Sequence, residues 1–243
     1  MTSPPPNRPM RNRLAGIVLI SLLASHAAAH AQTTPPANEI LRRVRGEFER
    51  IDDYRADVHI VARIPRVNVP PMDATVYYKK PDRFHIEAKG FAMLPRDAIS
   101  FNPMLFTEEM YDAVVQGEEI VDGIRCHKVK LLAKSDTLRL QRAMLFVDPT
   151  RWIVLRMAAD PARGSSADIR FTYAFIQNRW LLPSRVVIEI DAGPTARLPN
   201  KPGAPALGDD EKESQHSRIV MTYTNYSVNK GIPDSVFSPE HSP

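Results

Sequence analysis

The first long extended segment of the chain, residues 56–62, consists of Ala-Asp-Val-His-Ile-Val-Ala. Its even positions are apolar, and most of its odd positions are polar. Successive side chains of a β-strand point to opposite faces of a sheet, so this period of two predicts a strand with one buried face. The fold then depends on how often the same period recurs along the chain.

The alternation recurs downstream at residues 74–78 and 84–88. Further runs are 127–132, 138–147, 152–157, 169–176, 186–190 and 219–226. Turn residues separate the runs, at Pro81, Asp122-Gly123, Asp148-Pro149, Gly164, Asn178 and Pro183. Roughly nine or ten such strands predict a large antiparallel sheet, and hence a mainly β fold of the α+β class.

One amphipathic helix is predicted before the strands, over Asn38 to Arg50. Its apolar stripe consists of Ile40, Leu41, Val44 and Phe48. This spacing puts the four side chains on one face of a helix. Asn38 is the expected N-cap, and Glu39 behind it suits the positive end of the helix dipole.

The N-terminus has the pattern of an export signal. Arg11 and Arg13 precede an apolar run over 14–23, and Ala29-His30-Ala31 supplies small residues for cleavage. The run is shorter than the about 20 residues of a membrane-spanning helix. We therefore expect a signal peptide over 1–31 and a single domain over 32–243, secreted into the periplasm. The alternative is a cytosolic chain with a buried apolar helix at this place.

Charge and cysteine content narrow the function further. The chain has 32 basic side chains, and without the three arginines of the leader 29 remain against 28 acidic ones. A nearly neutral protein has no electrostatic footprint for nucleic acid. Cys126 is the only cysteine, so it makes no internal disulfide, and we expect it to be buried and inert.

Signatures of catalysis are absent from the sequence. It has no nucleophile elbow, no zinc-protease motif and no Gly-rich phosphate loop. Residues 164–168 are interpreted as a polar turn, and His59 and His85 alternate with apolar residues, which places them on the outward face. No histidine pair has metal-ligand spacing. We therefore expect a binding protein without metal or cofactor.

Two segments lack the strand period. Residues 90–115 are rich in Met, Phe and Leu but are cut by Pro95 and Pro103, so short helical pieces that cover an apolar surface are expected. Residues 194–217 are rich in Pro, Gly and charged side chains. A flexible polar loop between two strands is predicted there.

Several motifs together resemble a known family. Residues 76–84 resemble the basic-Pro-x-x-Phe hairpin of the outer-membrane lipoprotein carriers (LolA-like proteins) and their receptors. The turn Ile51-Asp52-Asp53-Tyr54, the strand entry over 121–129, the hairpin over 145–157 and the closing strand over 225–237 resemble further parts of that superfamily. Each motif is short, and their shared order carries the resemblance.

The resemblance implies an unclosed antiparallel β-barrel of about 11 strands, whose helices cover an apolar cavity for acyl chains. The predicted cavity lining is Val58, Ile60, Val76, Tyr78, Phe84, Ile86, Phe91, Met93, Leu94, Phe101, Met104, Leu105, Phe171, Tyr173 and Phe175. For each of these residues taken alone, ordinary core packing is the alternative. In the carriers an Arg precedes the hairpin Pro and latches the lid. Lys80 occupies that position here, without the rigid fork of Arg donors.

Two functions are compatible with this fold. The first is a periplasmic carrier or chaperone for a lipid or an acylated lipoprotein, acting as a monomer. The second is a lipid-sensing regulatory or scaffold module that acts on an inner- or outer-membrane protein of the cell envelope. An envelope enzyme of unseen mechanism is the third hypothesis, but the sequence offers no set of nucleophile, base and orienting group for it.

Overall fold

The computed structural model describes residues 2, 34–88, 102–161, 165–191 and 216–238. The chain divides into two units, residues 1–33 and 34–243, and the elements below belong to the second. Apart from residue 2, the predicted signal peptide lies outside the described residues. The helices are α1 (Ala37–Glu49) and the short 3-10 helices η1 (Pro103–Leu105) and η4 (Asp234–Phe237). The strands are β1 (Asp53–Arg63), β2 (Met72–Lys79), β3 (Arg83–Ala88), β4 (Tyr111–Val121), β5 (Ile124–Ala133), β6 (Leu140–Val147), β7 (Val154–Pro161), β8 (Ala167–Ile176), β9 (Trp180–Asp191) and β10 (His216–Val228).

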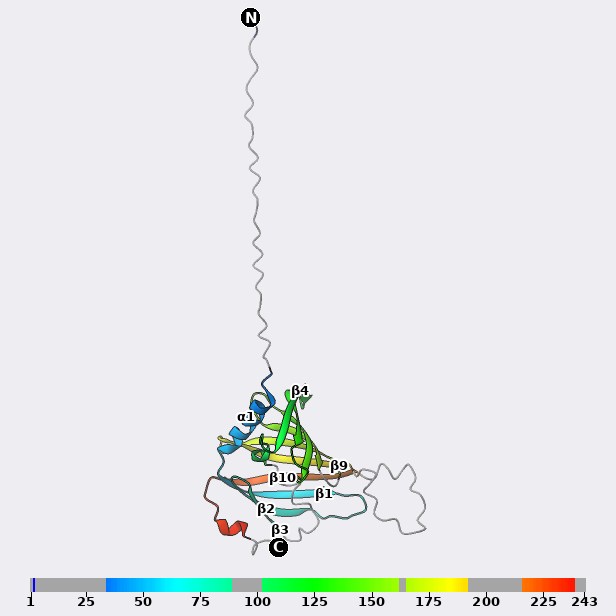
Figure 1. The fold of residues 1–243 in the computed structure, drawn as a ribbon. Coiled ribbons are helices and arrows are strands. Elements are labelled where there is room, and N and C mark those ends of the chain that lie inside the picture. Colours follow the sequence, from blue (N-terminus) through cyan, green and yellow to red (C-terminus); the bar gives the residue numbers. More distant parts are fainter. Residues whose placement is uncertain (1, 3–33, 89–101, 162–164, 192–215, 239–243) are drawn as a thin grey trace, which may run out of the picture. The chain divides into compact units, whose positions relative to one another are not determined.

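All ten strands form one antiparallel sheet, in the order β3-β2-β1-β10-β9-β8-β7-β6-β5-β4 (Figure 1). Neighbours in the sheet are neighbours in the chain, except that β1 pairs with β10. Strands β3 and β4 follow one another in the chain but lie at opposite ends of the sheet. The sheet is therefore open between them, which confirms the predicted unclosed barrel, with ten strands among the described residues where about eleven were predicted.

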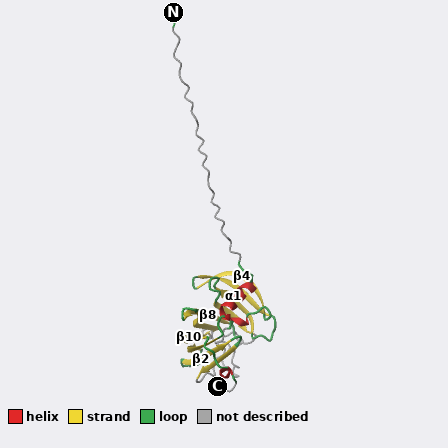
Figure 2. Ribbon diagram, turned by 90° about the vertical axis from the view of Figure 1, so that its left-hand side faces the viewer, coloured by secondary structure: helices red, strands yellow, loops and turns green. Residues whose placement is uncertain are grey.

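The core lies between α1 and one face of the sheet (Figure 2). Ile40, Leu41 and Val44 of the helix are buried in one cluster with the even-numbered residues of β1. Ala56, Val58, Ile60 and Ala62 are all buried there, whereas His59 is exposed. The period of two thus predicted the buried face of β1, because register allows only alternate side chains to reach the helix.

Several local boundaries differ from those predicted. Helix α1 begins at Ala37, since the Pro36 carbonyl accepts the first helical amide, from Ile40, at 3.1 Å, and Asn38 lies inside the first turn. Residues 111–115 of the predicted covering segment belong to β4. Strand β10 begins at His216, two residues inside the predicted polar loop, of which 194–215 lie outside the described residues. Pro183 is not a turn residue, because it lies in β9 beside a bulge opposite Tyr173, where the missing amide is tolerated.

The first and last strands are joined by a buried carboxylate. Asp53 is 5% exposed, and its two oxygens accept the amides of Lys230 and Gly231, each at 3.0 Å. The Asn229 side chain accepts the amide of Asp52 at 2.8 Å. Gly231 has a φ of 81°, a left-handed conformation that favours glycine. These contacts dock the end of β10 against the turn between α1 and β1.

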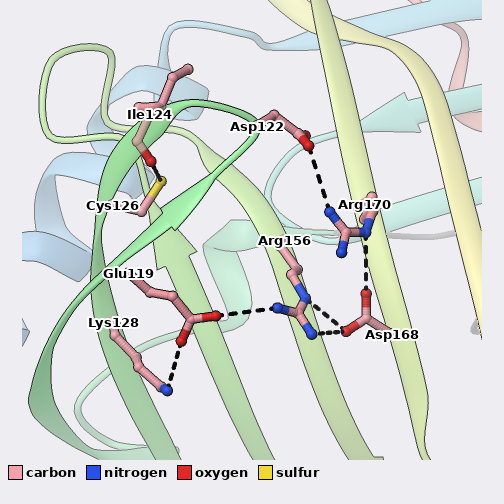
Figure 3. Close-up of polar contacts among 8 residues, drawn as sticks. All are labelled: Glu119, Asp122, Ile124, Cys126, Lys128, Arg156, Asp168 and Arg170. Atoms are coloured by element: carbon pink, nitrogen blue, oxygen red, sulfur yellow. Dashed lines mark hydrogen bonds and ion pairs between the residues drawn. The ribbon is translucent and has the colours of Figure 1, made fainter.

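The sheet face away from α1 carries a row of paired charges, which we call the outer ladder (Figure 3). It consists of Lys128, Glu119, Arg156, Asp168, Arg170 and Asp122. Arg156 is at its centre, 2.7 Å from Asp168 and 3.4 Å from Glu119, and its guanidinium lies 4.9 Å from the ring centroid of Phe146. Below the ladder, Phe146 and Cys126 belong to a second, smaller apolar cluster.

Two further findings concern the burial of His85 and the length of the helices. His85, predicted on the outward face, is only 8% exposed, and its ring lies 6.0 Å from that of Tyr77 on the paired strand. Among the described residues, no helix is long and apolar enough to cross a membrane.

Candidate functional site

A pocket of about 240 Å³ opens where α1 ends above one end of the sheet. Its walls come from the second half of α1 together with the start of β1, from η1, from the turn between β6 and β7, and from the hairpin of β8 and β9. The lining residues are Val44, Glu47, Phe48, Arg50, Ile51, Tyr54, Pro103, Thr150, Arg151, Trp152, Ile153, Val154, Tyr173, Phe175, Arg179, Trp180, Leu181, Leu182 and Pro183. Four segments far apart in the sequence thus build one site.

Aromatic rings dominate the pocket wall. Both tryptophans of the chain, Trp152 and Trp180, line it together with Phe48 and Phe175. Trp180 is 8% exposed, whereas Phe175 is 63% exposed. Large rings offer apolar area at low conformational cost, so a ligand that covers the Phe175 ring gains burial without reordering a flexible side chain.

Tyrosines complete the inner wall. The Tyr173 hydroxyl donates a hydrogen bond to the Val154 carbonyl at 3.0 Å. The polar atom of Tyr173 is thus satisfied within the protein, and its ring remains as apolar surface. Burial raises the pKa of Tyr173 above its usual value, and that of Tyr54 also, first through burial and then through the neighbouring tyrosines. Both phenols therefore stay neutral at physiological pH and contribute apolar ring surface to the pocket.

The turn between β6 and β7 is shaped by a buried carboxylate. Asp148 is 3% exposed, and its Oδ1 accepts the amides of Thr150 at 2.8 Å and Arg151 at 3.2 Å. Burial by itself would raise the pKa of Asp148, but the two amides and the Arg151 guanidinium, 2.7 Å away, lower it below its usual value. The ionised carboxylate thus caps the turn that carries Trp152.

Trp152 has an uncommon backbone conformation. Its φ is 53°, a left-handed value that is unusual for a bulky residue, and its amide donates to the Asp148 carbonyl at 2.9 Å. The Arg43 guanidinium lies 4.5 Å from the Trp152 ring centroid, and the His127 ring lies 6.0 Å away. The sequence predicted Trp152 as the first residue of a strand, but the capped turn places it before β7, in the pocket wall.

Charged side chains are confined to the rim of the pocket. Arg50, Arg151, Arg179 and Glu47 are all exposed there. Arg50 lies 3.5 Å from Glu47, and Arg151 pairs with Asp148. The Arg179 guanidinium lies 4.4 Å from the Trp180 ring centroid, and no carboxylate of the described ranges pairs with it. The rim therefore carries more positive than negative charge.

The residues predicted to line the cavity fall into four groups. Tyr173 and Phe175 line the pocket. Val58, Ile60, Val76, Tyr78 and Phe171 are buried in the main core, and Phe84 and Ile86 pack against it partly exposed. Met104 is half-buried and Leu105 is 41% exposed on η1. Phe91, Met93, Leu94 and Phe101 lie outside the described residues, so their lining role stays a prediction.

Lys80, the candidate latch, contacts the end of α1. Its Nζ pairs with Asp52 and donates to the Glu49 carbonyl at 3.2 Å. A cation beside the last carbonyls of a helix is favourable, because they carry the negative end of the helix dipole. Whether it also latches a lid stays a prediction.

Sequence reasoning missed most of the pocket. Phe48 was assigned to the apolar stripe of the helix, and the two tryptophans received no role. The available signal was position, since both tryptophans stand next to predicted turns, at Asp148-Pro149 and Asn178. Among the described residues, no three His, Cys, Asp or Glu side chains gather as metal ligands would.

Comparison with known proteins identifies the fold. No protein-family model and no curated protein matches the sequence. A DUF1329-family protein from Desulfovibrio piger is similar in structure, with a TM-score of 0.58 and 14% identity, over 86% of this chain and 100% of that chain. A LolA-superfamily protein from Nitrosomonas europaea has a TM-score of 0.56 and 13% identity, over 86% of this chain and 100% of that one. An outer-membrane lipoprotein-sorting protein domain from Vibrio parahaemolyticus has a TM-score of 0.57 and 7% identity, over 84% and 97%. The chain therefore has the LolA-like fold that the order of its sequence motifs predicted.

Proposed function

We propose that this protein binds and carries a lipid or an acylated ligand in the cell envelope. An acyl chain of the ligand inserts between α1 and the hairpin of β8 and β9. The observation that carries the proposal is the aromatic pocket at that place. Its rings are apolar, the Tyr173 hydroxyl is bonded to a backbone carbonyl, and its charges stand at the rim. Such a site favours a hydrocarbon chain over a polar molecule.

The energy of this binding comes from burial. Each CH₂ group transferred from water contributes about 0.8 kcal/mol. The pocket, at about 240 Å³, is slightly smaller than the range of about 300 Å³ and above that is usual for ligand sites. It therefore accommodates one chain or the end of one, and a longer chain extends past Phe175 at the mouth.

A binding role without catalysis fits the same residues. The one nucleophilic thiol, Cys126, is buried on the other side of the sheet, and burial raises its pKa to about 11. Its Sγ donates to the Ile124 carbonyl at 3.5 Å. Location in the periplasm is supported by the leader pattern over residues 1–31.

The two tryptophans provide a direct test. Both line the pocket, so a ligand bound there changes the intrinsic fluorescence of the purified mature protein. We expect saturable changes with single-chain lipids, and a lipid that copurifies in native mass spectrometry. Phe175→Ala removes an exposed ring of the pocket and is expected to weaken binding about tenfold, which equals about 1.4 kcal/mol.

Val114→Ala is the matched control, because Val114 is 54% exposed on β4 and does not line the pocket. It should leave the binding constant unchanged. If no acyl ligand alters the fluorescence and no lipid copurifies, the proposed function is wrong. Equal weakening by the two variants would show that acyl chains bind elsewhere.

A further inference from the structure

One guanidinium at the rim of the pocket pairs with no carboxylate of the described residues. Arg151 is engaged by Asp148 at 2.7 Å, and Arg50 lies 3.5 Å from Glu47. Arg179 stands at the tip of the hairpin between β8 and β9, and within the described part of the chain no carboxylate pairs with it. A cation without a carboxylate partner is available to a ligand.

The position of Arg179 suits a negatively charged group. Its guanidinium lies over Trp180, 4.4 Å from the ring centroid, and Trp180 itself lines the pocket. A guanidinium that stacks on a ring contacts the ring through its face. Its N–H donors point outward in the plane of the group, where their geometry matches a carboxylate or phosphate. Aromatic wall and cationic donors are therefore adjacent.

We propose that the pocket selects an anionic lipid, with the acyl chain among the rings and the carboxylate or phosphate of its head group bound by Arg179. This inference rests on the proposed function and makes it more specific. An acylated protein N-terminus has no charge beside its chains, because acylation removes the charge of the amine. The rim therefore favours a free lipid as the cargo over a lipoprotein.

The test compares ligands that share one chain and differ in head group. Dodecyl phosphate and dodecanoate are anionic, dodecylphosphocholine is zwitterionic and dodecyl maltoside is neutral. Each is titrated below its micelle concentration against the mature protein, and binding is followed by tryptophan fluorescence and calorimetry. We expect the anionic ligands to bind about tenfold more tightly than the neutral one, as one charge-assisted contact provides.

Two variants assign the selectivity to the rim. Arg179→Gln should abolish the preference for the anionic ligands and leave the binding of dodecyl maltoside unchanged. Glu47→Gln removes the one acidic side chain of the rim and should strengthen anionic binding about twofold to threefold, since it releases Arg50. Arg156→Gln, in the outer ladder, is the control and should change neither affinity.

The outcomes separate this inference from the proposed function. If all four ligands bind equally, or Arg179→Gln weakens them equally, the anionic preference is wrong while acyl binding stands. If none binds, both proposals are wrong. Inorganic phosphate should not compete at concentrations where dodecyl phosphate saturates. Equal competition would show a free-anion site and overturn the inference.

Discussion

Arg156 and Arg179 both lie over an aromatic ring, but their surroundings differ. In the outer ladder, Arg156 is between Asp168 and Glu119, and every charge shown in Figure 3 has a partner of opposite sign. At the pocket rim, Arg179 covers Trp180 and no described carboxylate pairs with it. An arginine over an aromatic ring thus stabilises the fold in the outer ladder, whereas at the pocket rim, as we propose, it binds a ligand. The distinguishing feature is the presence of carboxylates on the neighbouring strands.

The largest effect is expected from the turn beneath the rim. Asp148→Ala removes a buried carboxylate that accepts two amides and pairs with Arg151, so the free energy of unfolding should fall by about 2–3 kcal/mol. Urea denaturation measures this loss. Asp73→Asn is the control, because its carboxylate is 87% exposed and its loss should cost little. A similar small loss in both variants would mean that the capped turn does not stabilise the rim.

The comparison of the two arginines is tested directly by matched substitutions. Arg156→Gln leaves Asp168 and Glu119 without their shared cation, and should reduce the free energy of unfolding by about 1–2 kcal/mol. Arg179→Gln should change it by less than about 0.5 kcal/mol. Thermal and urea unfolding of the two variants give the difference. Equal losses would contradict the division into a structural and a binding guanidinium.

A smaller effect is expected in the pH dependence of stability. The folded state lowers the pKa of Asp148 below its unfolded value, so its contribution is fully present above the unfolded pKa and is lost as pH falls through the folded one. The difference in unfolding free energy between the natural protein and Asp148→Asn should therefore be constant near neutral pH and shrink below about pH 4. Urea titrations at several pH values check this. A difference that grows on acidification would show the opposite shift.

The smallest effect concerns the thiol below the outer ladder. Burial raises the pKa of Cys126 to about 11, so its thiolate is scarce near neutral pH. We expect a thiol reagent to label the folded protein slowly and the urea-unfolded protein quickly. Occupying the pocket with dodecyl phosphate should not speed the labelling, because Cys126 does not line the pocket. Fast labelling of the folded protein would place the thiol at the surface.

Local pattern was sufficient to predict the helix and every strand except β4, whose first residues, 111–115, were assigned to the covering segment. Val58 and Ile60 could be placed on a buried face because β-strand periodicity depends only on neighbouring residues. Ile40 and Val44 followed from helical spacing in the same way. Prediction failed locally at Asn38 and Pro183. At the start of the helix the Pro36 carbonyl accepts the first helical amide, and in β9 a bulge accommodates Pro183. Residue preferences encode neither arrangement.

The pocket could not be obtained from such patterns. Phe48, Trp152 and Trp180 belong to three segments whose separation in space depends on strand order and on the turn that Asp148 caps. Arg179 and Arg156 have the same side-chain chemistry, so only their positions in the fold decide which of them is available to a ligand. Periodicity specifies which side chains share one face of a strand or helix, because this depends only on neighbouring residues. Which buried and exposed groups meet at one site depends on long-range pairing of the strands, and for this reason the site became visible only in the folded chain.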